Sequence, residues 1–556
     1  MVETVVEALQ NAISVENRGP VFLDQRLEPV DMSWAQIYRE SEHRARCFRA
    51  LGLEKGDRLG MIVSDQQEFV LSFLGALLAG AVPVPMYPPF TSGIDAYIER
   101  IAGILSSAEA YYLLAFKGIA PFMDRLRARV PTLKRLIIPN DFSVLSDQQL
   151  EAHAKPVSIV PDDTCLLQFT SGSTSHPKGV MVTHTNLISN IGSIYRRLGN
   201  NSAPDLLVNW LPLYHDFGLI GSFILSVIYH AQIVFIPTMA FALRPRIWME
   251  TVHRYRATIT ASTNFGLELA VKHTARIQQL DLSCLRVIVI GAEPINPDNA
   301  RHFIETFSIA GLRSEALTPA YGMAEATLGI TTGSPEQNLR TIRLDRQIYE
   351  EENRMVEVSE SDPKNTLEVV SCGRTIPDHA VGIMDEQGTL LPEGQVGEVV
   401  FKGASTTAGY FGKTDATRRL FHEGWLKSGD LGSLLGGELY ISGRLKDLII
   451  IAGRNYHPHA IEWIVENVPG IRSASVAAFS IPGYGTERLV IVAECESCKN
   501  PQALKKKVKE CVQHDMGLSP FDVVLIKPWS LPKTSSGKLK RRETRIAYES
   551  GTLDCL

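Results

Sequence analysis

One stretch of small hydroxyl residues and glycine has the composition of a phosphate-binding loop. It follows a buried strand expected over residues 164–170 and leads to Lys178. Small residues leave backbone N–H groups open to an anion, and the lysine adds a positive charge. The spacing is not that of the Walker loop, and a Ser/Thr-rich surface turn is the alternative. The predicted phosphate-binding residues are Thr170, Ser171, Gly172, Ser173, Thr174 and Lys178.

Four further side chains suit a nucleotide. Tyr321 and Glu325 stand four residues apart, so that a ring can stack on a base while a carboxylate holds Mg²⁺ against phosphate oxygens. Asp430 adjoins a glycine turn and can accept hydrogen bonds from two ribose hydroxyls. Lys538 adds a positive charge in a loop of serine and glycine near the C-terminus. Taken singly, each has a plainer explanation, namely packing for the ring and a solvated surface for the charges.

These residues need elements to position them, and the pattern predicts an α/β fold. Short β-branched runs alternate with segments of helical period, which is typical of layered, mostly parallel sheets with helices. From about residue 396 the pattern changes to short strands with glycine turns, which indicates a small antiparallel β subdomain over about 370–440. The expected strands are 58–64, 164–170, 232–237, 285–291 and 488–494, and the expected helices are 33–51, 297–307, 459–468 and 501–513.

A domain boundary is expected near Lys446. We expect a large domain over 1–446 and a small mobile α+β domain over 447–556 that carries Lys538. A mostly polar stretch over about 334–368 is far longer than usual connections, which have about 4–6 residues. A solvated surface insertion is one interpretation of this stretch, and a functional segment is the other.

Composition narrows the class of protein. The chain has 556 residues and a formal net charge of −5, so no nucleic-acid partner is expected. Its 8 cysteines are scattered, and Cys495 and Cys498 form one CxxC without a second ligand pair, so reduced thiols are expected rather than a zinc site. No segment has the pattern of a signal peptide or the roughly 20 apolar residues of a membrane span. We expect a soluble, cytoplasmic protein.

In their order and spacing, these motifs resemble those of the adenylate-forming superfamily, which contains acyl-CoA synthetases, luciferases and peptide-synthetase adenylation domains. The resemblance extends over nearly the whole chain. The nearer match is the fatty acyl-AMP ligases, which are similar in carrying an insertion after the position of Glu325. The segments that carry this likeness are 79–89 (AGAVPVPMYPP), 211–216 (LPLYHD), 291–294 (GAEP) and 453–458 (GRNYHP).

The resemblance implies attack of a fatty-acid carboxylate on ATP, giving an acyl-adenylate and pyrophosphate. Lys538, Glu325 and Thr174 would be catalytic, with Mg²⁺ on Glu325 and Thr174, and Lys446 would be the hinge. The implied ATP-binding residues are the loop residues above with Gly291, Ala292, Glu293, Tyr321, Gly322, Met323, Asp430, Arg444 and Lys538.

The fatty acid has its own expected residues. The resemblance places His215 at the entrance of the acyl pocket, although a core histidine is the alternative. The apolar stretch 219–227 with Asn264 and Phe265 is a candidate wall for the chain, and core packing explains it equally well. The implied acyl-substrate residues are His215, Asp216, Asn264 and Phe265.

The acyl acceptor is expected to be the phosphopantetheine thiol of a separate acyl carrier protein. The insertion would pack against the small domain and disfavour CoA, and the lysines at 505–507 and 509 could dock an acidic carrier or form a solvated helix face. Two alternatives stay open: an acyl-CoA synthetase that uses free CoA, and a catalytically silent homologue that binds nucleotide or acyl chains.

Overall fold

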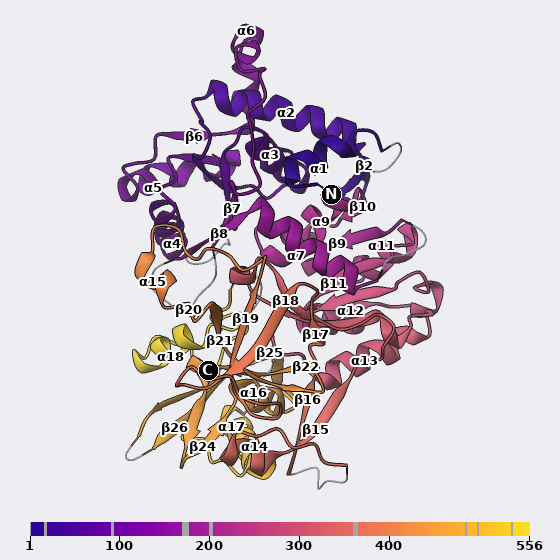
Figure 1. The fold of residues 1–556 in the computed structure, drawn as a ribbon. Helices are drawn as coiled ribbons and strands as arrows, with labels where there is room; N and C mark the ends of the chain where they lie inside the picture. Colours follow the sequence, from indigo (N-terminus) through magenta and orange to yellow (C-terminus); the bar gives the residue numbers. More distant parts are fainter. Residues whose placement is uncertain are drawn as a thin grey trace.

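The computed structural model describes residues 2–15, 19–89, 94–169, 177–199, 204–359, 365–483, 486–496, 500–534 and 538–556. Figure 1 shows the N-terminal part (indigo) at the top, the largest sheet (magenta) below it and the C-terminal part (orange to yellow) at the bottom. No described helix combines the length and apolar character that a membrane crossing needs.

The largest sheet has nine strands in the order β17-β14-β13-β12-β11-β9-β10-β1-β2. Its centre, from β13 to β1, is parallel, whereas β2, β14 and β17 pair antiparallel. Central strands such as β12 are short β-branched runs that lie almost wholly buried, as parallel strands do. The strands are β1 (Pro20–Leu23), β2 (Pro29–Asp31), β9 (Leu206–Asn209), β10 (Gln232–Phe235), β11 (Ile259–Ser262), β12 (Val287–Ile290), β13 (Leu317–Gly322), β14 (Gly329–Thr332) and β17 (Arg374–Thr375).

Helices cover both faces of this sheet. Val287 of β12 belongs to one core cluster and its neighbour Ile288 to another, as the period of two in a strand requires. The first cluster contains α1, α7 and α9, and the second contains α10 to α13 with Trp248 at its centre. The helices are α1 (Val5–Ala12), α7 (His184–Arg197), α9 (Leu225–Tyr229), α10 (Thr238–Leu243), α11 (Ile247–Tyr255), α12 (Asn264–His273) and α13 (Pro297–Ser308).

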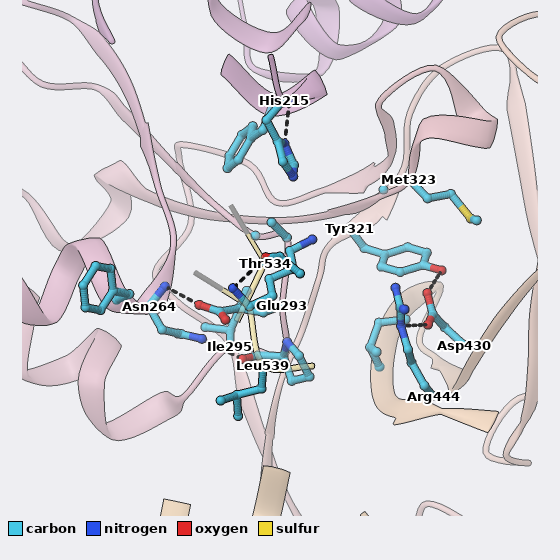
Figure 2. Close-up of a pocket in the computed structure, with 18 of the residues that line it drawn as sticks. His215, Asn264, Glu293, Ile295, Tyr321, Met323, Asp430, Arg444, Thr534 and Leu539 are labelled. Atoms are coloured by element: carbon cyan, nitrogen blue, oxygen red, sulfur yellow. Dashed lines mark hydrogen bonds and ion pairs between the residues drawn. The ribbon is translucent and has the colours of Figure 1, made fainter. Parts of the chain in front are cut away.

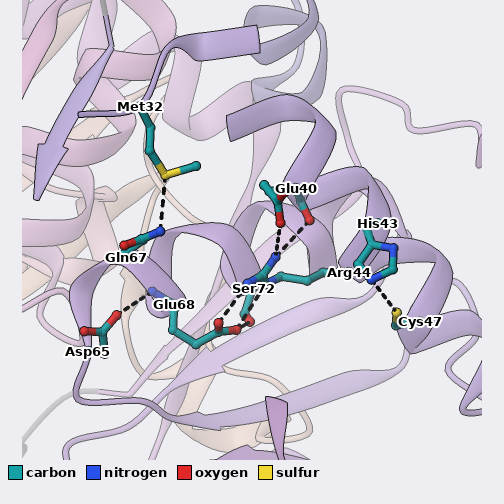
Figure 3. A network of polar contacts seen from close by, with 9 residues as sticks. All are labelled: Met32, Glu40, His43, Arg44, Cys47, Asp65, Gln67, Glu68 and Ser72. Carbon is teal, nitrogen blue, oxygen red and sulfur yellow. Dashed lines mark hydrogen bonds and ion pairs between the residues drawn. The ribbon is translucent and has the colours of Figure 1, made fainter. Parts of the chain in front are cut away.

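A second sheet, β4-β3-β5-β6, is parallel throughout. Beside it, Arg44 of α2 forms an ion pair with Glu68 of α3 at 2.8 Å, and Ser72 donates a hydrogen bond to the same carboxylate (Figure 3). Gly75 lets these helices approach, because a Cβ there would lie 2.9 Å from the Ser41 oxygen. The elements are β3 (Arg58–Ile62), β4 (Val82–Pro85), β5 (Tyr112–Ala115), β6 (Arg135–Ile137), α2 (Trp34–Ala50), α3 (Gln66–Leu78), α4 (Ile94–Ser107), α5 (Met123–Arg129) and α6 (Asp147–Glu151).

A hairpin carries the predicted phosphate loop. Strand β7 (Thr164–Phe169) pairs antiparallel with β8 (Gly179–Thr183). The link over 170–178 is too short for the crossover that parallel strands need. Five predicted site residues lie outside the described part of the chain: Thr170, Ser171, Gly172, Ser173 and Thr174.

An antiparallel five-stranded sheet follows, with β22 paired to β21 so that Asp430 lies opposite Arg444. The predicted α/β fold class, with parallel layers followed by an antiparallel sheet, is confirmed. The elements are β18 (His379–Met384), β19 (Gly397–Gly403), β20 (Phe421–His422), β21 (Trp425–Leu435), β22 (Glu438–Arg444) and α15 (Thr414–Arg418).

The polar segment 334–368 is folded where the structure describes it. It forms β15 (Thr341–Asp345), α14 (Arg346–Glu352) and the start of β16 (Thr366–Val370), with β15 and β16 paired antiparallel. A small core of its own contains Ile342, Leu344, Tyr349 and Met355 together with Tyr440 of β22.

The C-terminal part has a separate core. One apolar cluster consists only of residues between Ile449 and Leu525. This supports a separate small domain, while its hinge at Lys446 stays a prediction. The elements are β23 (Ile449–Ile451), β24 (Arg454–Tyr456), α16 (Pro458–Glu466), β25 (Ile471–Pro482), β26 (Glu487–Cys495), α17 (Pro501–Met516), β27 (Asp522–Ile526) and α18 (Arg541–Glu549).

Candidate active site

A cavity of about 1980 Å³ lies between the large sheet and the C-terminal part. The carboxyl ends of β9, β11, β12 and β13 meet at one edge of the sheet, which is where open α/β sheets bind ligands. All the predicted site residues that the structure describes line this cavity: Lys178, His215, Asp216, Asn264, Phe265, Gly291, Ala292, Glu293, Tyr321, Gly322, Met323, Glu325, Asp430, Arg444, Lys446 and Lys538.

One end of the cavity holds a ring, a carboxylate and a guanidinium. Tyr321 Oη donates to Asp430 Oδ2 at 2.8 Å, and Arg444 Nε lies 3.3 Å from Asp430 Oδ1 (Figure 2). Burial raises the pKa of Asp430, while Arg444 and Tyr321 oppose that rise. The β21–β22 register explains the Asp430–Arg444 contact. This group can contact the ring and the hydroxyls of a nucleoside.

The backbone of residues 291–293, which follow β12, is sterically constrained. Ala292 has a φ of 75°, and a Cβ on Gly291 would lie 2.6 Å from the Ala320 oxygen. Glu293 Oε1 accepts a hydrogen bond from Asn264 N at 3.0 Å, which ties this segment to the start of α12. The Asn264 side chain donates to the Pro294 oxygen at 2.8 Å. Asn264 therefore helps to fix the cavity wall through contacts with the backbone.

Glu325 lies buried at the wall of the cavity. Tyr410 Oη donates to its Oε1 at 2.6 Å, and Lys178 Nζ lies 4.9 Å from the centre of the Tyr410 ring. Burial raises the pKa of Glu325, while the hydrogen bond from Tyr410 and the charge of Arg444 oppose that rise. Mg²⁺ prefers carboxylate oxygens, so Glu325 can supply one ligand to a divalent cation, although the described residues hold no cluster of three acidic, histidine or cysteine ligands.

Lys538 brings a positive charge from the C-terminal part. The backbone N–H of Lys538 donates to Thr534 Oγ1 at 3.0 Å, and the backbone N–H of Thr534 donates to the carbonyl oxygen of Lys538 at 2.7 Å. Figure 2 shows Thr534 and Leu539 between the Glu293–Asn264 pair and the Tyr321–Asp430–Arg444 group. Burial lowers the pKa of Lys538, whereas Asp216, Glu293 and Asp430 act to raise it.

His215 and Asp216 line the same cavity as Lys538. His215 Nδ1 lies 2.6 Å from Asp216 Oδ1, and Phe217 N donates to the same oxygen at 2.7 Å. Burial acts to raise the pKa of Asp216, but His215 and Lys538 outweigh it, so the pKa is lowered. Asp216 is therefore an ionised carboxylate whose charge acts on Lys538.

Apolar residues also line the cavity, and they differ from the predicted apolar wall. Of the stretch 219–227, only Gly221, Ser222 and Leu225 line the cavity, whereas its other apolar residues are buried in the core. The cause is helical geometry, because the stretch forms a π-helical segment η3 (Leu219–Ile224) followed by α9 and only one side faces the cavity. Among the lining residues that sequence reasoning missed, because they carry no motif, are Ile194, Leu198, Leu328 and Tyr410.

Comparison with known proteins shows to which family the chain belongs. The family model described as AMP-binding enzyme matches residues 12–411. A Caulobacter vibrioides protein named as an acyl-CoA synthetase is 34% identical over 99% of this chain and 96% of its own length. The medium-chain-fatty-acid–[acyl-carrier-protein] ligase JamA of Moorena producens is 35% identical over 93% of this chain and 90% of its own length.

The solved structures that resemble this chain include those of fatty acyl-adenylate ligases. One, from a study of fatty acyl-adenylate ligases from E. coli and L. pneumophila, has a TM-score of 0.92 at 32% identity and covers 99% of this chain and 98% of its own. An L. pneumophila fatty acyl-adenylate ligase in complex with acyl adenylate and pyrophosphate has a TM-score of 0.74 at 29% identity, over 100% of this chain and 97% of its own. The predicted kinship with the fatty acyl-AMP ligases is confirmed, and the chain belongs to the AMP-binding enzyme family.

Proposed function

We propose that the protein activates a fatty acid with ATP. The acid's carboxylate oxygen attacks the α-phosphorus, the bond to the bridging β-phosphate oxygen breaks, and pyrophosphate leaves with that electron pair. The observation that carries this proposal is that Lys538 lines the same cavity as Asp430, Glu293 and Asp216, and that the charges of these three carboxylates act on the Lys538 ammonium. A charge at this point would lie between the two reacting anions.

Charge neutralisation is the main task in such a reaction, because two anions must meet. Lys538 would contact the carboxylate and the α-phosphate, and Lys178 would bind the leaving phosphates with the 170–174 loop. Asp430 and Arg444 would hold the ribose. The carboxylate is already ionised at pH 7, so it needs no general base.

The other residues then have binding roles. Tyr321 would stack on the adenine, against the backbone of 291–293 and beside Gly322 and Met323. His215, Asp216 and Phe265 would border the path of the acyl chain. Glu325, with Thr174, would hold Mg²⁺, which would supply positive charge to the phosphates.

The acyl group would pass to the phosphopantetheine thiol of a separate acyl carrier protein. The thiolate attacks the acyl carbonyl, and AMP leaves with the electron pair of the broken carbon–oxygen bond. The name of JamA supports a carrier as acceptor. The contacts of the 334–368 segment support it as well, because Glu351 pairs with Arg454 at 2.6 Å and so fastens this segment to the small domain. The lysines on the exposed side of α17 are a candidate docking face for an acidic carrier.

A second candidate function is acyl-CoA synthesis, which the name of the Caulobacter relative favours. Fatty-acid-dependent exchange of pyrophosphate into ATP, measured over a series of chain lengths, tests the first step. Loss of AMP from the bound adenylate upon addition of CoA or of a holo-carrier protein tests the second. We expect exchange with fatty acids and transfer to the carrier. Absence of exchange with every fatty acid contradicts activation, and transfer to CoA alone favours the second candidate.

A further inference from the structure

Arg541, the first residue of α18, has all three guanidinium nitrogens bound to carboxylates. Its Nε donates to Glu462 Oε1 at 2.7 Å and its Nη2 to Glu462 Oε2 at 2.6 Å. Its Nη1 donates to Asp447 Oδ2 at 3.2 Å. A bidentate fork of this kind fixes direction as well as distance, which a lysine cannot do.

The two carboxylates belong to different elements. Glu462 lies on α16, its side chain is only 4% exposed, and its Oε1 also accepts a hydrogen bond from Ala478 N of β25 at 2.9 Å. Asp447 directly follows Lys446, the predicted hinge residue. Arg541 therefore joins α18 to the core of the small domain and to the segment at its boundary.

Arg541 also lies three residues after Lys538. The backbone of Lys538 is held on its other side by the two hydrogen bonds with Thr534, and Lys540 N donates to the Pro532 oxygen at 3.0 Å. A lysine side chain has many rotamers, so the place of its ammonium group depends on a rigid backbone. Arg541 holds the same stretch of backbone from the other end, through its contacts with Glu462 and with Asp447 of the hinge segment.

We infer that Arg541 is a positioning residue that acts through Lys538, holding the lysine in the cavity and coupling it to the hinge segment through Asp447. This inference rests on the proposed function. A direct role on the ATP phosphates is disfavoured, because the nitrogens that would bind a phosphate are already bound to carboxylates.

The test is a double-mutant cycle on the full chain, measured by fatty-acid-dependent pyrophosphate exchange. Arg541→Gln should lower kcat by about 10–10²-fold, the scale of a small misplacement of a catalytic group, with little change in the KM for ATP. Arg541→Lys keeps the charge and should lower kcat less. In a Lys538→Ala background, Arg541→Gln should cause almost no further loss, because the group that it positions is gone.

A matched control is Arg545→Gln on the same helix, since Arg545 pairs only with Glu549 at 2.9 Å among the described residues. It should leave kcat unchanged. Asp447→Ala removes the acceptor of the hinge contact and leaves the Glu462 fork intact, so it should lower kcat by a smaller factor even where Arg541→Gln does not fold. Unchanged kcat in Asp447→Ala overturns the coupling to the hinge.

Equal losses in both backgrounds, or a loss confined to the KM for ATP, would show that Arg541 does not act through Lys538. The two proposals fail in different ways. Full activity of Lys538→Ala contradicts the proposed function itself. Impaired Lys538→Ala with fully active Arg541 variants contradicts only the role of Arg541.

Discussion

Lys538 must be charged when the carboxylate meets the phosphate, and its surroundings decide up to which pH it is charged. Burial lowers its pKa, since the charged ammonium loses solvation. Asp216 is the strongest of the groups that oppose this, and Asp216 is itself ionised beside His215. The site therefore holds a buried lysine whose protonation depends on a carboxylate that follows β9 of the large sheet.

This arrangement predicts a pH effect. The active form is protonated, so kcat/KM should fall as the pH rises through a pKa below the ordinary 10.5 of lysine. Asp216→Asn removes a charge that raises this pKa, so the alkaline limb should move to lower pH. The measurement is the pH profile of kcat/KM in pyrophosphate exchange, with Asp415→Asn on exposed α15 as a control. An unmoved alkaline limb in Asp216→Asn contradicts this account.

Single residues were predictable where a chemical type stood in a motif. Asp430, Glu325 and Lys538 carry charges that folding would bring to a nucleotide, and all three line the cavity. Tyr410 was missed because one tyrosine without a pattern gives no sign that its hydroxyl contacts a carboxylate 85 residues earlier. The roles of these residues remain predictions.

At the scale of elements, the segment 334–368 shows how a polar composition can hide a folded unit. Its few apolar residues, such as Ile342 and Tyr349, are spaced so that they meet in a small core with Tyr440. Its polar residues then reach the C-terminal part: Asn353 accepts a hydrogen bond from Asn455 at 3.0 Å, in addition to the Arg454–Glu351 pair. Sequence alone left open whether the segment was only a solvated loop, because these partners lie far along the chain.

Weakening the contact between the 334–368 segment and the C-terminal part should change the choice of acyl acceptor. Arg454→Ala removes a half-exposed ion pair, and such pairs contribute up to about 1 kcal/mol, so transfer to CoA should rise by about 2–5-fold relative to transfer to the carrier. The matched control is Arg354→Ala, whose partner Glu352 lies in the same segment at 2.9 Å. The ratio of the two thioester products is measured, and an unchanged ratio contradicts a role of this contact in acceptor choice.

The same interface contains a buried histidine. His457 Nε2 lies 2.9 Å from Tyr349 Oη, and burial lowers the pKa of His457 from 6.5 to about 4. The folded state favours neutral His457, so its contribution to stability is full above pH 6.5 and is lost as the pH falls toward 4. At pH 5 the loss should be about 2 kcal/mol.

Thermal unfolding of the full chain at pH 7 and pH 5 measures this effect. His457→Gln does not titrate, so its melting temperature should fall less between the two pH values than that of the wild type. His273→Gln, at an exposed histidine of α12, should behave as the wild type does. Equal drops in the wild type and in His457→Gln rule out this contribution.

At the scale of the whole molecule, the site exists because two separately built parts meet. The sheet edge supplies Tyr321, Glu293 and Asp216, and the C-terminal part with its own core supplies Lys538. The alternation of strands and helices predicted the layers, since each pattern is local. The arrangement of the two parts relative to each other was not predictable, because it depends on contacts such as Arg454–Glu351 between distant segments.

The central claim is that this meeting of the two parts activates a fatty acid, and Lys538→Ala tests it most directly. The measurement is fatty-acid-dependent exchange of labelled pyrophosphate into ATP, with Lys509→Ala on the exposed side of α17 as a control for loss of one positive charge. Lys538→Ala should exchange about 10²–10³-fold more slowly, the usual scale for loss of one preorganised charge, while the control keeps the wild-type rate. A wild-type rate of exchange in Lys538→Ala would contradict the account.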